Sequence, residues 1–318
     1  MSTNGPPPFL QQLVGLTEPA QLMAWALSHN IRVFAGAILK GQILAPITQT
    51  QRLRDEAFGR FWIDFSCKSK SNPQIQTYNS SPCKNNSKLT FIAPREVPSD
   101  SDSNEPPAPV GSSALIPPLL HTASGVVLDI GPGTGTQMHL LTSPSITALY
   151  GAEPCTSLHS AIREKAEQRG ISSKYHILST GVTATELIPA LRDSGLDVDS
   201  DGIFDTILCV RVLCSVPNME KTVRELYGML KPGGRILVTE HVVNPWRRAK
   251  GSVLARVAQF CYQVLGWSWL IGDCALDRDT ETALRGAAGE EGWESVELER
   301  NFEWSAMPYI SGVFVKRG

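Results

Sequence analysis

A glycine-rich stretch carries the strongest chemical signal in the sequence. Residues 126–135 read Val-Val-Leu-Asp-Ile-Gly-Pro-Gly-Thr-Gly, an apolar run followed by three alternating glycines. Glycine lets the backbone adopt left-handed conformations and approach a ligand closely. In open α/β sheets, such loops bind nucleotide-like ligands beyond the carboxyl ends of the strands. The positions predicted to bind a cofactor here are Asp129, Gly131, Gly133 and Gly135.

The spacing of the glycines and a second acid narrow the class of cofactor. The loop is G-x-G-x-G preceded by an acid, whereas nicotinamide and flavin enzymes typically have G-x-G-x-x-G. Glu153 ends the next expected strand, 18 residues after Gly135. A carboxylate there can accept hydrogen bonds from both hydroxyls of a ribose. The alternative, a tight strand–helix turn without a ligand, does not account for the whole ordered set.

His241 is the candidate general base. It follows Glu240 at the end of an expected strand over residues 235–240. A histidine titrates near neutral pH and can take a proton from an acceptor hydroxyl. We therefore predict His241 as the catalytic residue, with Glu240 orienting it or binding the insertion that follows. A structural imidazole that is hydrogen-bonded to the backbone is the competing interpretation.

The segment after this strand, residues 246–273, reads as a helical insertion rich in aromatic residues. Such side chains suit an apolar pocket for an acceptor molecule, although core packing explains them equally well. The aromatic residues concerned are Phe260, Tyr262, Trp267 and Trp269.

The second half of the chain alternates between strand and helix patterns. This alternation predicts right-handed βαβ crossovers and a doubly wound, mostly parallel sheet in a Rossmann-like α/β fold. Two late strands without a helix between them predict an antiparallel edge, giving seven strands with an antiparallel last strand. The expected strands are 126–130, 148–152, 175–178, 206–210, 235–240, 295–302 and 310–316, and the expected helices are 137–141, 155–168, 185–193, 219–230 and 278–289.

Composition divides the chain into three parts. Residues 1–66 predict a helical cap, with one helix starting at Thr17-Glu18-Pro19 and another over residues 52–65. Residues 67–113 are rich in Ser, Pro and Asn, and we expect a disordered linker there. Residues 114–318 form the predicted cofactor-binding domain, including the insertion 246–273.

Charge and cysteine usage limit the possible partners. A formal net charge of -2 provides no basic field for nucleic acid. The seven cysteines form no C-x-x-C pair, which favours reduced thiols in the cytoplasm, and no metal site is expected. Arg32 and Lys40 interrupt the apolar segment 23–47, and each would cost about 2.5–3.5 kcal/mol at the centre of a bilayer. An amphipathic helix that covers the active site, or that makes peripheral membrane contact through residues 19–47, is therefore favoured over a membrane-spanning helix.

From residue 115 to the end, the chain resembles class I S-adenosylmethionine-dependent methyltransferases. The resemblance rests on the glycine loop, Glu153 and the Leu-Lys-Pro-Gly-Gly turn at 230–234 before the fifth strand. It implies S-adenosylmethionine (SAM) as the cofactor, with the glycine loop at its methionyl part and Glu153 at its ribose. The same resemblance places Thr180 and Gly181 beside the adenine and Arg211 and Val212 beside the cofactor. Many members of the family have an acid after the third strand, whereas this chain has Ser-Thr-Gly at 179–181.

Three short motifs carry a narrower resemblance, to fungal secondary-metabolism methyltransferases and more distantly to animal methyltransferase-like enzymes that act on small thiols. They are Val-Leu-Cys-Ser-Val at 212–216, Thr-Glu-His-Val at 239–242 and Gly-Asp-Cys at 272–274. The animal group carries an N-terminal membrane-associating segment. The expected reaction is O-methylation of a hydroxyl or carboxyl group on a small fungal-type metabolite. The alternatives are S-methylation of a small thiol and, in another class, a SAM-binding partner protein without catalysis.

Overall fold

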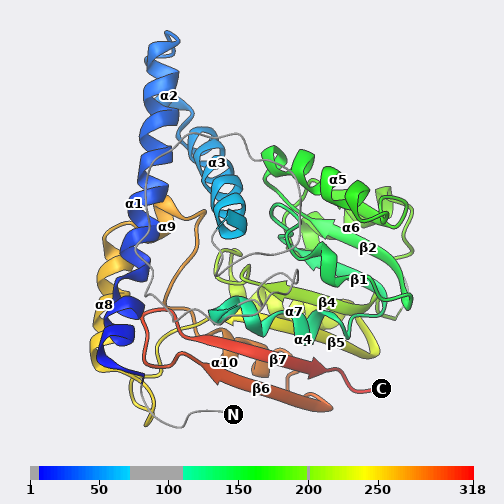
Figure 1. The fold of residues 1–318 in the computed structure, drawn as a ribbon. Coiled ribbons are helices and arrows are strands. Elements are labelled where there is room, and N and C mark those ends of the chain that lie inside the picture. Colours follow the sequence, from blue (N-terminus) through cyan, green and yellow to red (C-terminus); the bar gives the residue numbers. More distant parts are fainter. Residues whose placement is uncertain (1–6, 72–109, 199–200) are drawn as a thin grey trace, which may run out of the picture.

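The computed structural model describes residues 7–71, 110–198 and 201–318 (Figure 1). Its centre is a seven-stranded sheet in the order β3-β2-β1-β4-β5-β7-β6. The first five strands pair in parallel, and β7 is antiparallel to both β5 and β6. This confirms the predicted doubly wound sheet with its antiparallel edge. The strands are β1 (Gly125–Ile130), β2 (Ile146–Ala152), β3 (Tyr175–Leu178), β4 (Phe204–Val210), β5 (Leu230–His241), β6 (Ser295–Asn301) and β7 (Tyr309–Val315).

Helices cover both faces of the sheet. Alternate residues of β1 point to opposite faces, so Leu128 packs with the helices α6, α7 and α10, and Val127 packs with α4 and α5. Burying one such aliphatic side chain contributes about 1.5–3 kcal/mol to the stability of the fold. Since helices cover both faces of the sheet, both faces carry apolar side chains. These helices are α4 (Pro117–Leu120), α5 (His159–Gln168), α6 (Ala184–Asp193), α7 (Met219–Met229) and α10 (Thr280–Gly286).

The expected turn at 230–234 lies inside the range of β5. There the pairing with β4 jumps from Phe204–Leu230 to Thr206–Arg235, and Gly233 has a φ of +73°, so residues 231–234 loop out of the ladder. The expected helix over 137–141 was wrong, since it is only a short 3₁₀ turn, η2 (Met138–Leu140). Further 3₁₀ turns are η1 (Gly111–Leu115) and η3 (Thr156–Leu158).

The N-terminal cap consists of α1 (Phe9–Leu39), α2 (Ala45–Thr48) and α3 (Thr50–Ser71). The predicted helix start at Thr17 was wrong, since α1 begins at Phe9 and continues through Pro19. A proline inside a helix leaves the carbonyl four residues earlier without its helical donor. Here the freed carbonyl of Gly15 accepts a hydrogen bond from the backbone N–H of Ala306 (3.1 Å). A contact remote in sequence thus lets the helix continue.

The insertion forms α8 (Val253–Val264) and α9 (Trp267–Leu270), and both helices pack against α1. The Tyr262 hydroxyl donates to the carbonyl of Leu16 (2.9 Å). Arg54 of α3 forms an ion pair with Asp273 (2.7 Å) after α9. Cap and insertion therefore form one layer beside the sheet (Figure 1). Since α3 reaches Ser71, the helix extends past the expected cap boundary at residue 66, and the disorder expected in the linker concerns mainly residues 72–109, outside the described part of the chain.

Candidate active site

The glycine loop after β1 packs between the segment that follows β4 and helix α3. Gly131, Gly133 and Gly135 have φ values of +58°, +60° and +69°, in the left-handed region that favours glycine. A Cβ atom on Gly131 would lie 2.6 Å from Cγ2 of Val212, and one on Gly133 would lie 2.5 Å from Nε1 of Trp62. The loop therefore has no room for side chains at Gly131 and Gly133, because Val212 and Trp62 already lie against its backbone.

Glu153, at the end of β2, is hydrogen-bonded to this loop. Its Oε2 accepts from the N–H of Gly133 (3.0 Å), and its Oε1 accepts from the N–H of Cys155 (2.9 Å). Burial raises the pKa of Glu153 to about 7, although the two N–H groups oppose the shift. The carboxyl group thus lies beside the glycine loop, where the sequence predicted the ribose site.

Asp129 is held by a residue that the sequence did not single out. The hydroxyl of Tyr175 in β3 donates to Asp129 Oδ2 (2.9 Å), reaching past β2. Gly151 of β2 makes this possible, because a Cβ atom there would lie 2.5 Å from the tyrosine oxygen. Burial raises the pKa of Asp129 to about 6. Two carboxyl groups and three glycines therefore lie at the same edge of the sheet, and this set fits the sulfonium cofactor, which supplies the electrophilic methyl group when bound.

The residues predicted beside the adenine lie in the loop after β3. A Cβ atom on Gly181 would lie 2.6 Å from Oε2 of Glu186, in the first turn of α6. The same carboxylate accepts from the Thr183 hydroxyl (2.6 Å). Gly181 therefore does have an acid beside it, and this acid follows the loop by several residues.

The two residues predicted after β4, Arg211 and Val212, make contacts in different places. Val212 packs against the glycine loop, as described above. Arg211 points elsewhere, since its guanidinium donates to the hydroxyls of Ser112 (2.8 Å) and Ser113 (3.1 Å) and lies 5.7 Å from the centre of the Tyr309 ring. Only Val212 of this pair contacts the glycine loop.

Glu240 supports the loop after β4. Its Oε1 accepts from the N–H groups of Val212 (2.8 Å) and Leu213 (2.9 Å), and its Oε2 has no hydrogen-bond partner among the described residues. Burial raises the pKa of Glu240 to about 7. The expected orienting contact with His241 is replaced by these backbone contacts.

His241 lies in a sulfur-rich environment. Its Nε2 is 3.2 Å from Sγ of Cys274, and the side chains of Cys214, His241 and Cys274 are all buried. Burial lowers the pKa of His241, but the neighbouring Cys214 and Glu240 outweigh this and raise it above its ordinary value. The separations of 27 and 33 residues between these three positions match no familiar metal motif, and the sequence therefore did not reveal the cluster.

Aromatic side chains from the cap and the insertion gather around Cys214 and Cys274. Phe61 and Trp267 are fully buried in one cluster with Cys214 and Cys274. Trp62 stacks on Phe58 and also lies against the glycine loop, so α3 connects the aromatic cluster with that loop. Of the four aromatic residues predicted to line the acceptor pocket, Trp267 lies in this cluster and Tyr262 packs against it, whereas Phe260 and Trp269 are exposed.

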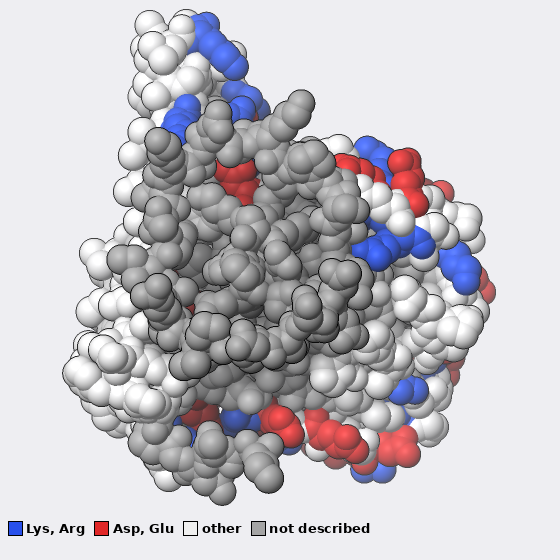
Figure 2. Space-filling view, viewed as in Figure 1, with Lys and Arg blue, Asp and Glu red and all other residues white. Residues whose placement is uncertain are grey.

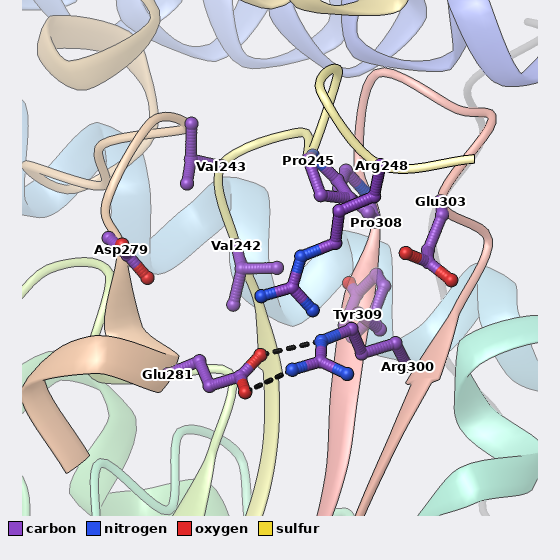
Figure 3. A pocket seen from close by; sticks show the side chains of 10 residues that line it. All are labelled: Val242, Val243, Pro245, Arg248, Asp279, Glu281, Arg300, Glu303, Pro308 and Tyr309. Carbon is purple, nitrogen blue, oxygen red and sulfur yellow. Dashed lines mark hydrogen bonds and ion pairs between the residues drawn. The ribbon is translucent and has the colours of Figure 1, made fainter. Parts of the chain in front are cut away.

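A separate cavity of about 160 Å³ lies beyond the end of β5 (Figure 3). It is lined by both signs of charge, and Arg300 of β6 forms an ion pair with Glu281 of α10 within it. Val242 and Tyr309 form part of its apolar wall. No residue of the glycine loop lines it, and we assign it no part in cofactor binding.

Comparisons with known proteins identify the family of this chain. Residues 108–296 match the protein family described as a methyltransferase domain. The chain is 30% identical over 197 residues to thiol S-methyltransferase TMT1B of Rattus norvegicus, covering 60% of this chain and 70% of that protein. It is 29% identical over 203 residues to TMT1B of Homo sapiens, covering 61% and 72%. The ubiquinone biosynthesis O-methyltransferase of Xanthomonas euvesicatoria is 28% identical over 120 residues, covering 38% and 44%. The chain therefore belongs to the methyltransferase-domain family and is a class I SAM-dependent methyltransferase that acts on a small molecule.

Proposed function

We propose that this enzyme transfers the methyl group of SAM to the sulfur of a small, mainly apolar thiol. The proposal reverses the order of the two acceptors expected from sequence, where O-methylation of a metabolite came first. Among the relatives, the proteins named thiol S-methyltransferase match over about 200 residues, and the named O-methyltransferase matches over 120.

The contacts of His241 and Glu240 carry the proposal. A phenol or alcohol acceptor needs a general base, worth about 10²–10⁴-fold in rate. The His241 Nε2 faces the Cys274 sulfur, and Glu240 binds backbone N–H groups instead of the imidazole. Glu240 therefore does not orient His241 as a general base that could take a proton from a hydroxyl group.

A thiol makes smaller demands on the protein. A thiol is a far stronger acid than an aliphatic alcohol (the cysteine side chain has an ordinary pKa of about 8.5), and the thiolate is a strong nucleophile. What remains for the protein is to hold sulfur, methyl and sulfonium in line, which can contribute about 7–11 kcal/mol. The aromatic cluster around Trp267 and Phe61 would provide the apolar walls for such an acceptor.

A membrane-binding face accompanies this function in our proposal. Helix α1 is long and apolar enough to cross a membrane by length and composition, but one side of it is buried through Ala26, Val33 and Ala37. Its other side exposes Leu27, Ile31 and Ile38 at helical spacing. Helix α8 exposes a second apolar stripe, and in Figure 2 the edge formed by α1 and α8 is nearly free of charge. The residues of that second stripe are Val253, Val257, Phe260 and Val264.

The tip between α1 and α3 strengthens this interpretation. Leu39 and Ile47 are 87% and 79% exposed, and Lys40 beside them is exposed as well. Apolar side chains with a neighbouring cation are typical of segments that insert into the interface of a bilayer. A membrane contact would bring the aromatic cluster close to the phase in which apolar thiols dissolve.

The discriminating experiment measures S-adenosylhomocysteine formed with matched panels of alkyl thiols, phenols and carboxylic acids. We expect turnover with thiols, rising with the apolar character of the acceptor, and at least tenfold lower kcat/KM for the other classes. A Glu153→Ala variant corrects for contaminating activity. Faster turnover of phenols or carboxylic acids than of any thiol would restore O-methylation as the function.

Membrane binding is tested separately by sedimentation with phosphatidylcholine vesicles containing anionic lipid. A Val257→Asp/Phe260→Asp double variant should lose most of the bound fraction, because two charges enter the apolar stripe of α8. Val110→Asp is the matched control, since Val110 is an exposed apolar residue that belongs to neither helix. Equal sedimentation of all three proteins would exclude this face.

A further inference from the structure

Three chain segments bring soft metal ligands together beside the acceptor side. Cys214 lies in the loop after β4, His241 ends β5, and Cys274 follows α9. Their ligand atoms all lie within 4.8 Å of one another, and all three residues are buried. His241 Nε2 lies 3.2 Å from Cys274 Sγ.

The donor set matches zinc in type and spacing. Zn²⁺ prefers thiolate and imidazole ligands in a tetrahedron, with Zn–S near 2.3 Å and Zn–N near 2.0–2.1 Å, and this geometry separates the ligand atoms by about 3.5–3.8 Å. The His241–Cys274 separation of 3.2 Å lies slightly below that range, and the other separations do not exceed 4.8 Å. Two thiolates also neutralise the charge of a divalent ion, so an occupied site would bury no net charge.

Hydrogen bonds around the cluster hold the ligands in place. The indole Nε1–H of Trp267 donates to Sγ of Cys274 (3.2 Å), and the backbone N–H of Ala275 donates to the carbonyl of Cys214 (2.9 Å). The Ser268 hydroxyl donates to the carbonyl of Cys274 (2.7 Å). Outer contacts of this kind orient metal ligands and tune the sulfur atoms. The two cysteine segments are thus tied to each other directly.

We propose that Cys214, His241 and Cys274 bind one Zn²⁺ ion, and that its fourth position accepts the sulfur of the methyl acceptor. The thiol part of this statement rests on the proposed function, whereas the metal site stands on the cluster alone. Three protein ligands and one open position are the pattern of catalytic zinc sites. The site lies next to the cofactor loop, because Cys214 is two residues from Val212, which packs against Gly131.

The reaction at such a site balances without another reactant. The acceptor R–SH binds the ion and releases its proton to solvent, so that a thiolate forms at neutral pH. A lone pair of this sulfur then forms the new S–CH₃ bond while the bond from the methyl carbon to the sulfonium sulfur breaks. The products are R–S–CH₃, S-adenosylhomocysteine and one proton. The uncharged thioether is a poorer ligand and dissociates.

The first test is the metal content of the purified full-length protein, prepared without chelator or added metal. We expect about one zinc per chain, lost in Cys214→Ser and Cys274→Ser and retained in Cys261→Ser. Cys261 is the matched control because it is exposed on α8, outside the cluster. If both cluster variants fail to fold, His241→Asn and reversible removal of zinc with a chelator from the unaltered protein provide the same comparison.

Replacement by Co²⁺ tests the open position. Cobalt bound by thiolates gives charge-transfer absorption in the near ultraviolet and visible bands that report the coordination geometry. An alkyl thiol should shift the visible bands, and a matched alcohol should not. The metal site is wrong if the protein binds no metal, or if a Cys214–Cys274 disulfide is the stable form under the same conditions. The open position is wrong if cobalt binds but its spectrum does not change when a thiol is added.

The two proposals fail in different ways. Stoichiometric zinc in an enzyme that methylates only hydroxyl or carboxyl acceptors would leave the metal site standing and remove the thiol function. Full thiol turnover by metal-free protein would leave the thiol function standing and remove the role of the ion in the reaction.

Discussion

The glycine loop after β1 and the layer formed by the cap and the insertion would form the cofactor side and the acceptor side of the proposed site, and they are built differently. The loop side uses backbone geometry within a short stretch of chain, with Glu153 only 20 residues from Gly133. The cap side uses side chains from separate segments, such as Phe61 and Trp267, more than 200 residues apart. A site made of backbone in left-handed conformations tolerates few substitutions, whereas a site lined by side chains can change one residue at a time. Substitutions on the two sides should therefore change cofactor and acceptor binding separately.

The largest effect is expected at the glycine loop. Gly133→Ala should weaken SAM binding by about 100-fold, because its Cβ meets Trp62 and its φ value is unfavourable for alanine. Gly170→Ala is the matched control, with a φ of +66° and open space around the new Cβ. It should cost about 1 kcal/mol of stability and leave SAM affinity unchanged. Calorimetric titration with SAM measures the affinity of each variant. Equal affinities of the two variants would contradict the role given to the packing around Gly133.

Glu153→Gln should weaken SAM binding by about 10- to 100-fold at pH 8, as expected for losing hydrogen bonds to a charged group. The folded-state pKa of about 7 is above the ordinary value, so the carboxylate prevails only above pH 7. SAM affinity of the unaltered enzyme should therefore fall as the pH drops from 8 to 6. The glutamine variant should show a flatter profile, and a parallel decline in both proteins would assign the titration to another group.

On the acceptor side, Trp267→Phe should raise the KM for a thiol about fivefold and leave the SAM dissociation constant unchanged. The substitution keeps an aromatic ring but removes the N–H donated to Cys274, a loss of about 1 kcal/mol. Steady-state kinetics with each substrate varied in turn separates the two constants. An equal effect on both would break the separation between cofactor side and acceptor side.

The smallest effect is expected at the ion pair between cap and insertion. Asp273→Asn should lower the free energy of unfolding by at most about 1 kcal/mol, because Asp273 is 60% exposed although Arg54 is mostly buried. The difference from the unaltered protein should shrink at 1 M salt, where charges are screened within about 3 Å. Denaturant unfolding at two salt concentrations measures it. A larger, salt-independent loss would show that Asp273 acts through its backbone conformation instead.

Much of the cofactor side was predictable from particular residues. The strand into Asp129, the three glycines and the acid Glu153 are local patterns, and each strand expected in the second half of the chain was found. The base prediction at His241 fared differently. Its position at the end of β5 was correct, but its neighbours Cys214 and Cys274 come from other segments, and Glu240 turned toward the backbone of Val212. The helix start at Thr17 was wrong because the donor that satisfies Gly15, Ala306, is remote in sequence.

The sequence by itself determined the alternating sheet, the glycine loop and the class of cofactor, because hydrophobic period and backbone freedom are properties of neighbouring residues. Only the tertiary structure decided that α3 lies on the loop, with Trp62 against Gly133, and that three distant residues form a sulfur-rich cluster. Such contacts depend on how helices pack on the edge of the sheet. The direction in which a helix packs on the sheet produces no periodic pattern in the sequence. The proposed acceptor side depends most on that direction.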